Sequence, residues 1–141
     1  NLDNLNTRRD LLKASTFAGL AFSNTMTAAA HSISYPLTIK YGIPHGIASS
    51  ITLIPLLKKN KNFISEPLNL ICNKNNLSFE ELIDVMRSIP KGIISYKLKD
   101  WGVRRIDLPS LTDESFTKGR IDNNIVDLNS DDILKILKSI F

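Results

Sequence analysis

Apolar side chains recur at the three- and four-residue spacing of an α-helix through much of this chain, and no clear run of β-branched residues alternates with polar ones. Helical spacing places apolar residues on one face that can pack against another helix, whereas a half-buried strand requires a period of two. The chain has 141 residues, which corresponds to one domain in the usual range of roughly 100–200 residues. We therefore predict one all-α unit over residues 1–141 with little or no sheet.

Breaks in this pattern indicate where the helices end. Gly42-Ile43-Pro44 is such a break, because proline cannot continue a helix and disfavours the helical conformation in the residue before it. Pro55 should kink or end the helix in which it lies. The resulting predicted helices cover residues 8–22, 26–41, 46–59, 78–88 and 130–140.

Polar residues at the starts of these helices support the same division. Asn6 or Thr7 can cap the first helix with a side-chain oxygen. Ser78 and Glu81 have the spacing of a capping box, in which each side chain accepts a hydrogen bond from the other's backbone N–H. Ser130 can cap the last helix, whose first turn then carries two carboxylates at the positive end of the helix dipole.

Composition and charge exclude several classes of protein. The chain is 43% hydrophobic and 23% charged, which is typical of globular proteins and not of disordered ones. Cys72 is the single cysteine, so a disulfide-linked scaffold is excluded. The net charge of +4 is small and scattered, and we expect no nucleic-acid partner. No apolar run approaches the roughly 18–20 residues of a membrane span, so we expect no membrane partner.

The beginning of the chain supports one alternative. Thr7-Arg8-Arg9-Asp10-Leu11-Leu12-Lys13 is similar to a twin-arginine export signal, and Thr27-Ala28-Ala29-Ala30 is similar to a small-residue cleavage site. An exported all-helical binding protein with a leader at residues 7–30 is therefore one hypothesis. Two features weigh against it: the chain begins at Asn1 without a methionine, and a second pattern is already present at His31.

The two histidines of the chain, His31 and His45, are fourteen residues apart. On one continuous helix they would lie about 21 Å apart, which is too far to share a ligand. The break at Gly42-Ile43-Pro44 allows the chain to reverse and to bring His45 beside the helix that carries His31. Imidazole is a common ligand of Fe, Zn, Cu and Ni, so two converging histidines form half of a transition-metal site. On spacing alone, ordinary core or surface histidines are the alternative.

The residues around the two histidines form a more specific pattern, in three segments: Ala21-Phe22-Ser23-Asn24-Thr25, Ala30-His31-Ser32-Ile33-Ser34-Tyr35-Pro36-Leu37 and Ile43-Pro44-His45-Gly46-Ile47-Ala48. Together they resemble the iron-containing alcohol dehydrogenase family, in which a helical histidine is followed by Pro-Leu and, at the same spacing as here, by a Pro-His-Gly turn. The resemblance is dense over residues 8–60, thin over 61–105 and weak over 119–132. It implies that His31 and His45 bind a metal ion, Fe²⁺ or alternatively Zn²⁺.

The resemblance also implies a fold and a reaction. The fold is the helical C-terminal domain of the iron-containing alcohol dehydrogenase and dehydroquinate synthase-like group. The reaction is hydride transfer between NAD(P)H and a small alcohol or aldehyde, neutral or anionic, with the metal as Lewis acid. The chain lacks the Gly-rich phosphate-binding turn and the Asp-x-x-x-His segment that precede this region in the family. We therefore expect a helical metal-binding fragment, inactive by itself, of a cytoplasmic enzyme in which NAD(P)H binds to the absent domain; a homodimer is one expected assembly.

Three further residues receive roles from the resemblance. Tyr35 stands where many members have a further histidine four residues after the first, and we assign it a catalytic role. Phe22 falls where members place an apolar wall of the substrate pocket, although it could equally belong to a plain core. Arg120 lies where the C-terminal segment approaches the substrate, and its guanidinium can bind a phosphonate or carboxylate bidentately; an ordinary solvated arginine is the alternative.

Two further interpretations concern the branch of the family and a chain without catalytic activity. The variants around the histidines are most similar to the phosphonoacetaldehyde reductase-like branch of the family, which is a weaker resemblance than that to the family itself. The third hypothesis is a helical interaction module without catalysis. The absence of the Gly-rich turn and of the Asp-x-x-x-His segment fits such a module as well as it fits part of an enzyme.

Overall fold

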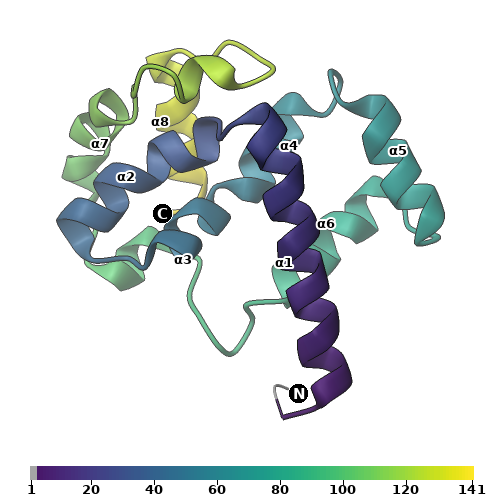
Figure 1. The fold of residues 1–141 in the computed structure, drawn as a ribbon. Coiled ribbons are helices and arrows are strands. Elements are labelled where there is room, and N and C mark those ends of the chain that lie inside the picture. The colour runs from purple at the N-terminus through teal and green to yellow at the C-terminus, as the bar shows by residue number, and fades with distance from the viewer. Residues whose placement is uncertain (1–2) are drawn as a thin grey trace.

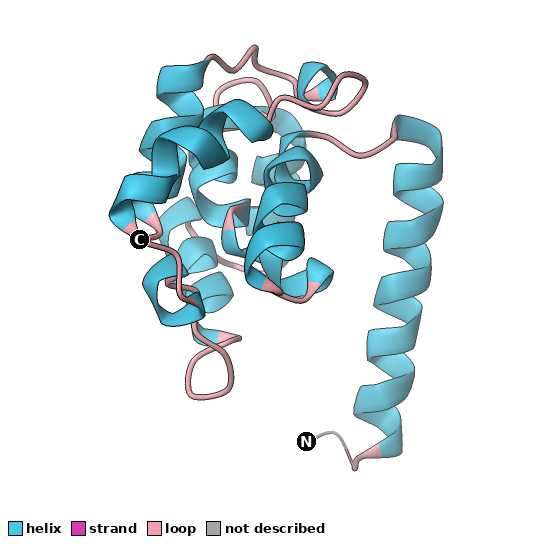
Figure 2. Ribbon diagram, turned by 90° about the vertical axis from the view of Figure 1, so that its left-hand side faces the viewer, coloured by secondary structure: helices cyan, strands magenta, loops and turns pink. Residues whose placement is uncertain are grey.

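The structure is a computed structural model that describes residues 3–141. Every regular element in this range is helical, and the range contains no β-strand (Figures 1 and 2). The all-α prediction is therefore confirmed. The α-helices are α1 (Leu5–Thr25), α2 (Ala29–Tyr41), α3 (His45–Ile51), α4 (Leu53–Asn60), α5 (Ser65–Lys74), α6 (Phe79–Ser88), α7 (Leu108–Glu114) and α8 (Ser130–Ser139), and the 3₁₀ helices are η1 (Leu98–Trp101), η2 (Arg105–Asp107) and η3 (Ile121–Asn123).

Four of the five predicted helices are present, as α1, α2, α6 and α8. The prediction of one helix over residues 46–59 is wrong in one respect, because this segment forms two helices, α3 and α4, which are separated at Thr52. Pro55 explains the break, since it lacks the N–H that would otherwise bond to the carbonyl of Ile51. The sequence identifies the residue responsible, but the interruption lies three residues before it.

Helices α5 and α7 are not among the predicted helices, and the helical spacing of apolar residues is weak in both. The buried residues of α5 are only Leu68 and Cys72. Seven-residue α7 begins at Leu108, with a proline in its first turn, and buries Leu108 and Leu111. A helix of this length is marginal in isolation, so burial against other elements stabilises it.

The predicted cap of α1 is displaced by two or three residues. Asn4, rather than Asn6 or Thr7, caps the helix, and its side-chain oxygen accepts from the N–H groups of Asn6 and Thr7 at 2.9 and 3.3 Å. The predicted capping box of α6 is confirmed. The N–H of Ser78 donates to the Glu81 carboxylate at 2.7 Å, and the N–H of Glu81 donates to Ser78 Oγ at 3.2 Å.

The cap of α8 is also displaced. Asn129, rather than Ser130, caps the helix, and Asp132 completes a capping box with it. The Asp132 carboxylate also accepts from Lys59 Nζ at 2.7 Å, which links α8 to α4. This second bond pairs residues far apart in the sequence, so local spacing does not reveal it.

The core forms around α2. This helix packs against α3 and α7, and α7 packs in turn against α8. Ile33 and Leu37 of α2 are completely buried. The other apolar residues with at most 1% exposure are Ala29, Ile43, Ala48, Leu98, Ile83, Leu108, Leu111, Ile133 and Leu137. Residues from both ends of the chain therefore hold α2 in place.

Helix α1 lies outside this core as a long arm beside the rest of the domain (Figure 2). None of its residues is buried, although it carries several large exposed apolar side chains: Leu5, Leu11, Leu12, Phe17, Leu20 and Phe22. Asn123 ties the chain just after α1 to η3, because its Nδ2 donates to the carbonyls of Thr25 and Thr27 at 2.7 and 3.2 Å. Within residues 3–141, no helix combines the length and the apolarity that crossing a membrane requires.

Alanine substitution tests the contrast between α2 and α1. Leu37→Ala leaves a cavity in the core, so we expect it to lower the free energy of unfolding by about 2–5 kcal/mol. Leu12→Ala removes the same atoms from a side chain that is 69% exposed, and it should change that free energy by less than about 0.5 kcal/mol. Urea unfolding followed by circular dichroism measures both. An equally large effect of Leu12→Ala would show that α1 belongs to the core.

Asp107 is the charged contact that joins the end of α2 to the start of α7. Its carboxylate accepts from Nε and Nη2 of Arg104 at 2.9 and 2.8 Å, and from the Arg104 N–H at 3.1 Å. Hydrogen bonding to the Arg104 side chain is the largest cause that lowers the pKa of Asp107 from 3.8 to about 2, and the Tyr41 hydroxyl acts in the same direction.

This contact predicts a specific pH dependence of stability. Because the pKa of Asp107 is lower in the folded than in the unfolded chain, the carboxylate stabilises the fold above about pH 4 and loses this effect as the pH falls towards 2. Asp107→Asn should therefore lower the stability at neutral pH and flatten its decline between about pH 4 and pH 2. Asp113→Asn, at an exposed position of α7, is the control. Equal slopes for the wild type and Asp107→Asn would contradict the prediction.

Candidate metal centre

A tight turn between α2 and α3 reverses the chain after Tyr41. Gly42 ends α2 in the left-handed conformation, with φ 65° and ψ 17°, which glycine adopts without the steric cost of a Cβ. Ile43 is completely buried and anchors the turn in the core. Pro44 precedes α3, and its carbonyl accepts from the N–H of Ala48 at 2.9 Å. The turn therefore fixes the start of α3 beside α2.

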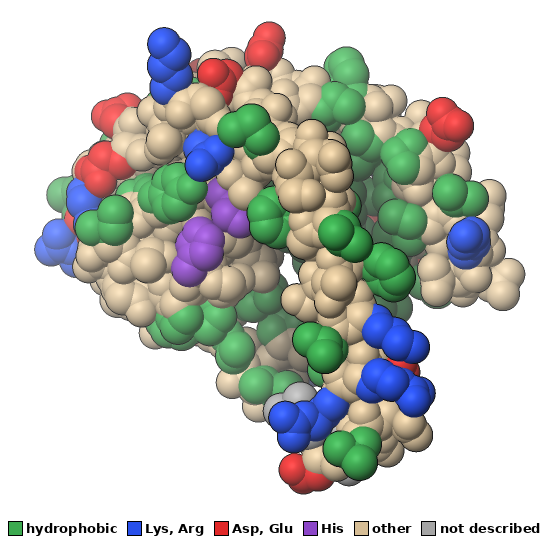
Figure 3. Space-filling view, viewed as in Figure 1, with side chains coloured by type: hydrophobic (Ala, Val, Ile, Leu, Met, Phe, Trp, Pro, Cys, Tyr) green, Lys and Arg blue, Asp and Glu red, His purple; other side chains and the backbone are tan. Residues whose placement is uncertain are grey.

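His31 and His45 lie side by side as a result. His31 is in the first turn of α2, and His45 is the first residue of α3. The ring centroids are 5.3 Å apart, with 59° between the ring planes. Figure 3 shows the two rings close together at the surface. The structure thus brings together the two residues that the sequence analysis selects as metal ligands.

Tyr35 and Arg120 lie against the histidines. Tyr35 is one turn after His31 on α2, and its ring stacks on His45 with centroids 6.0 Å apart and 9° between the planes. Arg120 precedes η3, and its Nε donates to the Tyr35 hydroxyl at 3.4 Å. The two histidines, the tyrosine and the arginine form one cluster, which we call the histidine cluster.

Phe22 is placed differently. It lies near the end of α1, outside the core, and 55% of its surface is exposed. In this chain it is therefore not enclosed in the way that a pocket wall would be, and its role in binding substrate stays a prediction.

The surroundings of His31 favour its neutral form. Burial is the largest cause that lowers the pKa of His31, and the neighbouring His45 and Arg120 lower it further through charge repulsion. A neutral imidazole has a free lone pair on one nitrogen, which is the state that binds a metal ion. Burial thus favours the neutral, metal-binding state of His31, whereas the positive charge of Arg120 repels a metal cation as it repels a proton.

Ser32 ties the segment before Arg120 to α2. Its hydroxyl is fully buried, donates to the carbonyl of Ser115 and accepts from the N–H of Thr117 at 3.1 Å. This pair of bonds joins positions more than eighty residues apart. These two bonds, which we call the Ser32 clamp, hold the segment that leads to Arg120 close to the helix that carries His31.

Ser34 lies against the histidine cluster and is not among the site residues predicted from the sequence. It is completely buried on α2. Its Oγ lies 2.7 Å from the carbonyl oxygen of His31 and 3.3 Å from Nδ1 of His45. The position three residues after a helical histidine is the available sequence signal, since a serine there can reach back to the histidine's carbonyl.

No third His, Cys, Asp or Glu side chain of the described residues joins the histidine pair in a metal-binding group. Within residues 3–141, no three or more His, Cys, Asp or Glu side chains gather closely enough to hold a metal ion. Two imidazoles supply half of the ligands of a four-coordinate site.

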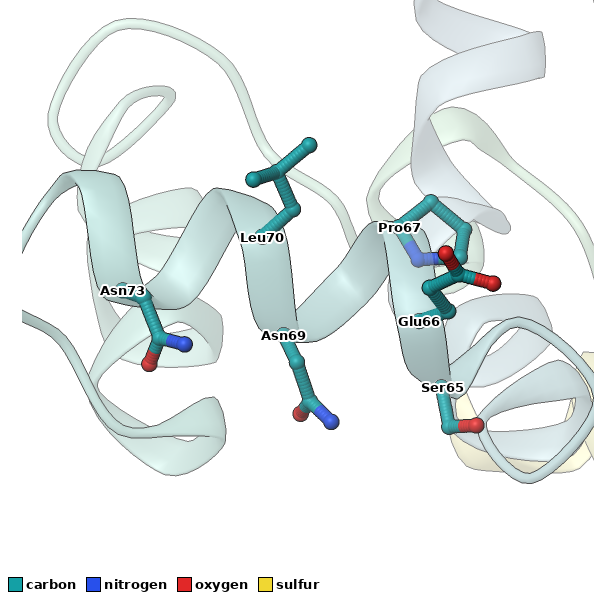
Figure 4. A pocket seen from close by; sticks show the side chains of 6 residues that line it. All are labelled: Ser65, Glu66, Pro67, Asn69, Leu70 and Asn73. Carbon is teal, nitrogen blue, oxygen red and sulfur yellow. The ribbon is translucent and has the colours of Figure 1, made fainter.

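Two hollows lie elsewhere on the surface. One, of about 760 Å³, lies between α4, α6, α8 and the segment that contains Tyr96 and Lys97, and its lining includes isoleucines and basic side chains. The other runs along α5, and Figure 4 shows that all its lining side chains come from this one segment, with Leu70 pointing away from Asn69 and Asn73. Neither hollow is lined by His31 or His45; His45 is exposed and His31 is half-buried in this chain.

Comparison with known proteins identifies the family. The sequence profile described as "Fe-containing alcohol dehydrogenase family, C-terminal" matches residues 1–141. The chain belongs to this family. Its all-helical architecture is that of the C-terminal domain of Fe-containing alcohol dehydrogenases, and the resemblance stated from the histidine motifs is confirmed. The matched range includes residues 7–30, so the family accounts for the segment that the export hypothesis reads as a leader.

Individual members of the Fe-containing alcohol dehydrogenase family are similar over different lengths. NADPH-dependent butanol dehydrogenase of Clostridium saccharobutylicum is 26% identical over 148 residues, covering 95% of this chain and 38% of that protein. Phosphonoacetaldehyde reductase of Streptomyces viridochromogenes is 42% identical over 53 residues, covering 38% of this chain and 13% of that protein. A crystal structure of 1,3-propanediol oxidoreductase has a TM-score of 0.79 at 26% identity, covering 91% of this chain and 36% of that one. The chain thus spans less than two fifths of the length of each of these relatives.

The proximity of Arg120 to His31 can be tested without any metal. Because the guanidinium lowers the pKa of His31, Arg120→Met should raise that pKa. Arg105→Met is the matched control, since Arg105 lies over the ring of Phe141 instead. Titration of the imidazole proton signals by NMR measures both variants. An unchanged His31 pKa in Arg120→Met would show that the arginine is not held at the cluster in solution.

Proposed function

We propose that this chain is the helical metal-binding part of a metal-dependent alcohol dehydrogenase or aldehyde reductase that uses NAD(P)H. In this proposal residues 1–141 act as one unit, and His31 and His45 together bind Fe²⁺, or alternatively Zn²⁺. The observation that carries the proposal is the convergence of the two imidazoles, whose centroids are 5.3 Å apart, in a chain of the Fe-containing alcohol dehydrogenase family.

The separation of the rings supports a shared ion. A metal bonded to one nitrogen of each ring at about 2.0–2.1 Å holds the two ring centres roughly 4.5–5.5 Å apart. The observed separation of 5.3 Å falls in this range. The burial that lowers the pKa of His31 adds to this fit, because protons then compete less with a metal ion for the ring nitrogen.

The reaction also requires groups other than the two histidines. Bound at the two histidines, the metal would supply Lewis acidity towards an alcohol or carbonyl oxygen. We propose that the further metal ligands and the nicotinamide site belong to a part of the enzyme outside this chain. The coverage of the relatives, 38% of the butanol dehydrogenase for example, leaves room for such a part.

Tyr35 and Arg120 give the proposed site its polarity. The Tyr35 hydroxyl accepts from Arg120, so its own proton is free to be donated to a substrate oxygen. The Arg120 guanidinium keeps donors beyond the one used on Tyr35, and two of them can hold a carboxylate or phosphonate bidentately. We therefore propose a small aldehyde or alcohol substrate with an anionic group as the preferred class. The similarity to a phosphonoacetaldehyde reductase supports this choice.

Zinc binding to the purified 141-residue chain tests the role of the histidines, because Zn²⁺ accepts imidazole and has no redox chemistry of its own. We expect saturable binding of one ion per chain in isothermal titration calorimetry. His31→Ala and His45→Ala should each weaken it by roughly tenfold or more, since each removes one of the two ligands.

Tyr35→Phe is the matched control for these variants. It keeps the ring stacked on His45 and removes only the hydroxyl, so zinc affinity should stay close to that of the wild type. If both alanine variants retain wild-type zinc affinity, the histidines are not ligands, and the hypothesis of a helical module without catalysis gains support.

A further inference from the structure

The buried hydroxyl of Ser34 connects the two histidines in a way that the metal-binding pattern does not require. Its Oγ lies between the carbonyl oxygen of His31, at 2.7 Å, and Nδ1 of His45, at 3.3 Å. The residue has no exposed surface, so water does not compete for these contacts. The His31 carbonyl oxygen and the His45 ring nitrogen therefore compete for the one hydroxyl group of Ser34, which has a single proton.

The single hydroxyl proton of Ser34 determines which group donates and which accepts in each of these hydrogen bonds. A serine hydroxyl has one hydrogen to donate and two lone pairs with which it accepts. The His31 carbonyl can only accept, and the 2.7 Å separation is the usual length of an O–H···O bond. The hydroxyl proton is therefore used on the carbonyl. The Ser34 oxygen can then only accept from the ring of His45, so Nδ1 must carry the ring's proton.

This arrangement determines which nitrogen of His45 remains free. A neutral imidazole carries one N–H, so a proton on Nδ1 leaves the lone pair on Nε2. Tyr35 stacks on the same ring at 9° and holds its plane. Together the serine and the tyrosine limit both the rotation and the tautomer of a ring that is otherwise exposed at the surface.

We propose that Ser34 is a positioning residue that holds His45 as its Nδ1–H tautomer and so directs Nε2 towards the metal ion. This inference rests on the proposed function, in which His45 is a ligand. Metal-binding histidines generally donate their other ring N–H to an oxygen, which orients the ring and raises its basicity as a ligand. Here a side chain three residues after His31 supplies that oxygen to His45, so the orientation of the His45 ring depends on the helix that carries His31.

The tautomer can be measured directly in the metal-free chain. Because the chain has only two histidines, a ¹⁵N-histidine-labelled sample gives two ring systems in long-range ¹H–¹⁵N spectra, and His31→Ala assigns them. The measurement is made at about pH 8.5, well above the ordinary histidine pKa of about 6.5. We expect His45 of the wild type to be the Nδ1–H form. In Ser34→Ala it should shift towards Nε2–H, the form that isolated histidine prefers in water.

Ser32→Ala is the matched control. Ser32 is a second fully buried serine of the same helix, but its hydroxyl bonds to Ser115 and Thr117 rather than to a histidine ring. Any general effect of removing a buried hydroxyl from α2 should appear in it too, and circular dichroism checks that both variants fold. A wild-type His45 in the Nε2–H form, or a Ser34→Ala variant that keeps Nδ1–H, overturns the inference.

Zinc affinity provides the second readout and separates this inference from the proposed function. Ser34→Ala should weaken Zn²⁺ binding by about 10–100-fold, as is typical when the partner of a ligating histidine is removed, while Ser32→Ala should weaken it less. Wild-type zinc affinity in Ser34→Ala overturns the inference and leaves the histidine ligands intact. If the wild-type chain binds no zinc, the proposed function fails, and the tautomer measurement alone then decides the role of Ser34.

Discussion

The burial of one face of α2 is the constraint on which the rest of the structure depends. Ile33 and Leu37 of this face are completely buried, and the helix packs against α3 and α7. Because a helix repeats every 3.6 residues, fixing these two side chains also fixes the direction of the residues between them and before them. His31 and Tyr35, four residues apart, then share another side of the same helix. Packing that is purely apolar thus orients the polar residues of the candidate metal centre.

Two connections bring the remaining groups to this helix. The turn at Gly42 and Pro44 carries His45 back to α2, and its geometry depends on a left-handed residue followed by a proline. The clamp from Ser32 to Ser115 and Thr117 brings in the segment that leads to Arg120. The first connection is local, whereas the second joins the two ends of the domain. Arg120 therefore joins the cluster only when the segment around Ser115 has packed against α2.

The chemistry of the cluster follows from this convergence. The two imidazoles that we propose as metal ligands lie beside a stacked tyrosine, which offers a hydroxyl, and an arginine, which carries positive charge. The exposed ring of His45 and the exposed apolar side chains of α1 show that this face is open in the chain as it stands. The chain belongs to the Fe-containing alcohol dehydrogenase family, and its matches cover 38% of the butanol dehydrogenase and 36% of the 1,3-propanediol oxidoreductase.

Local patterns in the sequence determine much of this protein. Helical spacing predicts the all-α class, Gly42-Ile43-Pro44 predicts the reversal, Ser78 and Glu81 predict a capping box, and the motifs around His31 and His45 indicate the family. These features depend on neighbours a few residues away. Only the tertiary structure decides the break at Thr52, the helix α7 and the place of Arg120, which meets Tyr35 across 85 positions. It also decides the role of Ser34, because one buried hydroxyl can face both histidines only after α2 and α3 have packed together, and no local spacing encodes that contact.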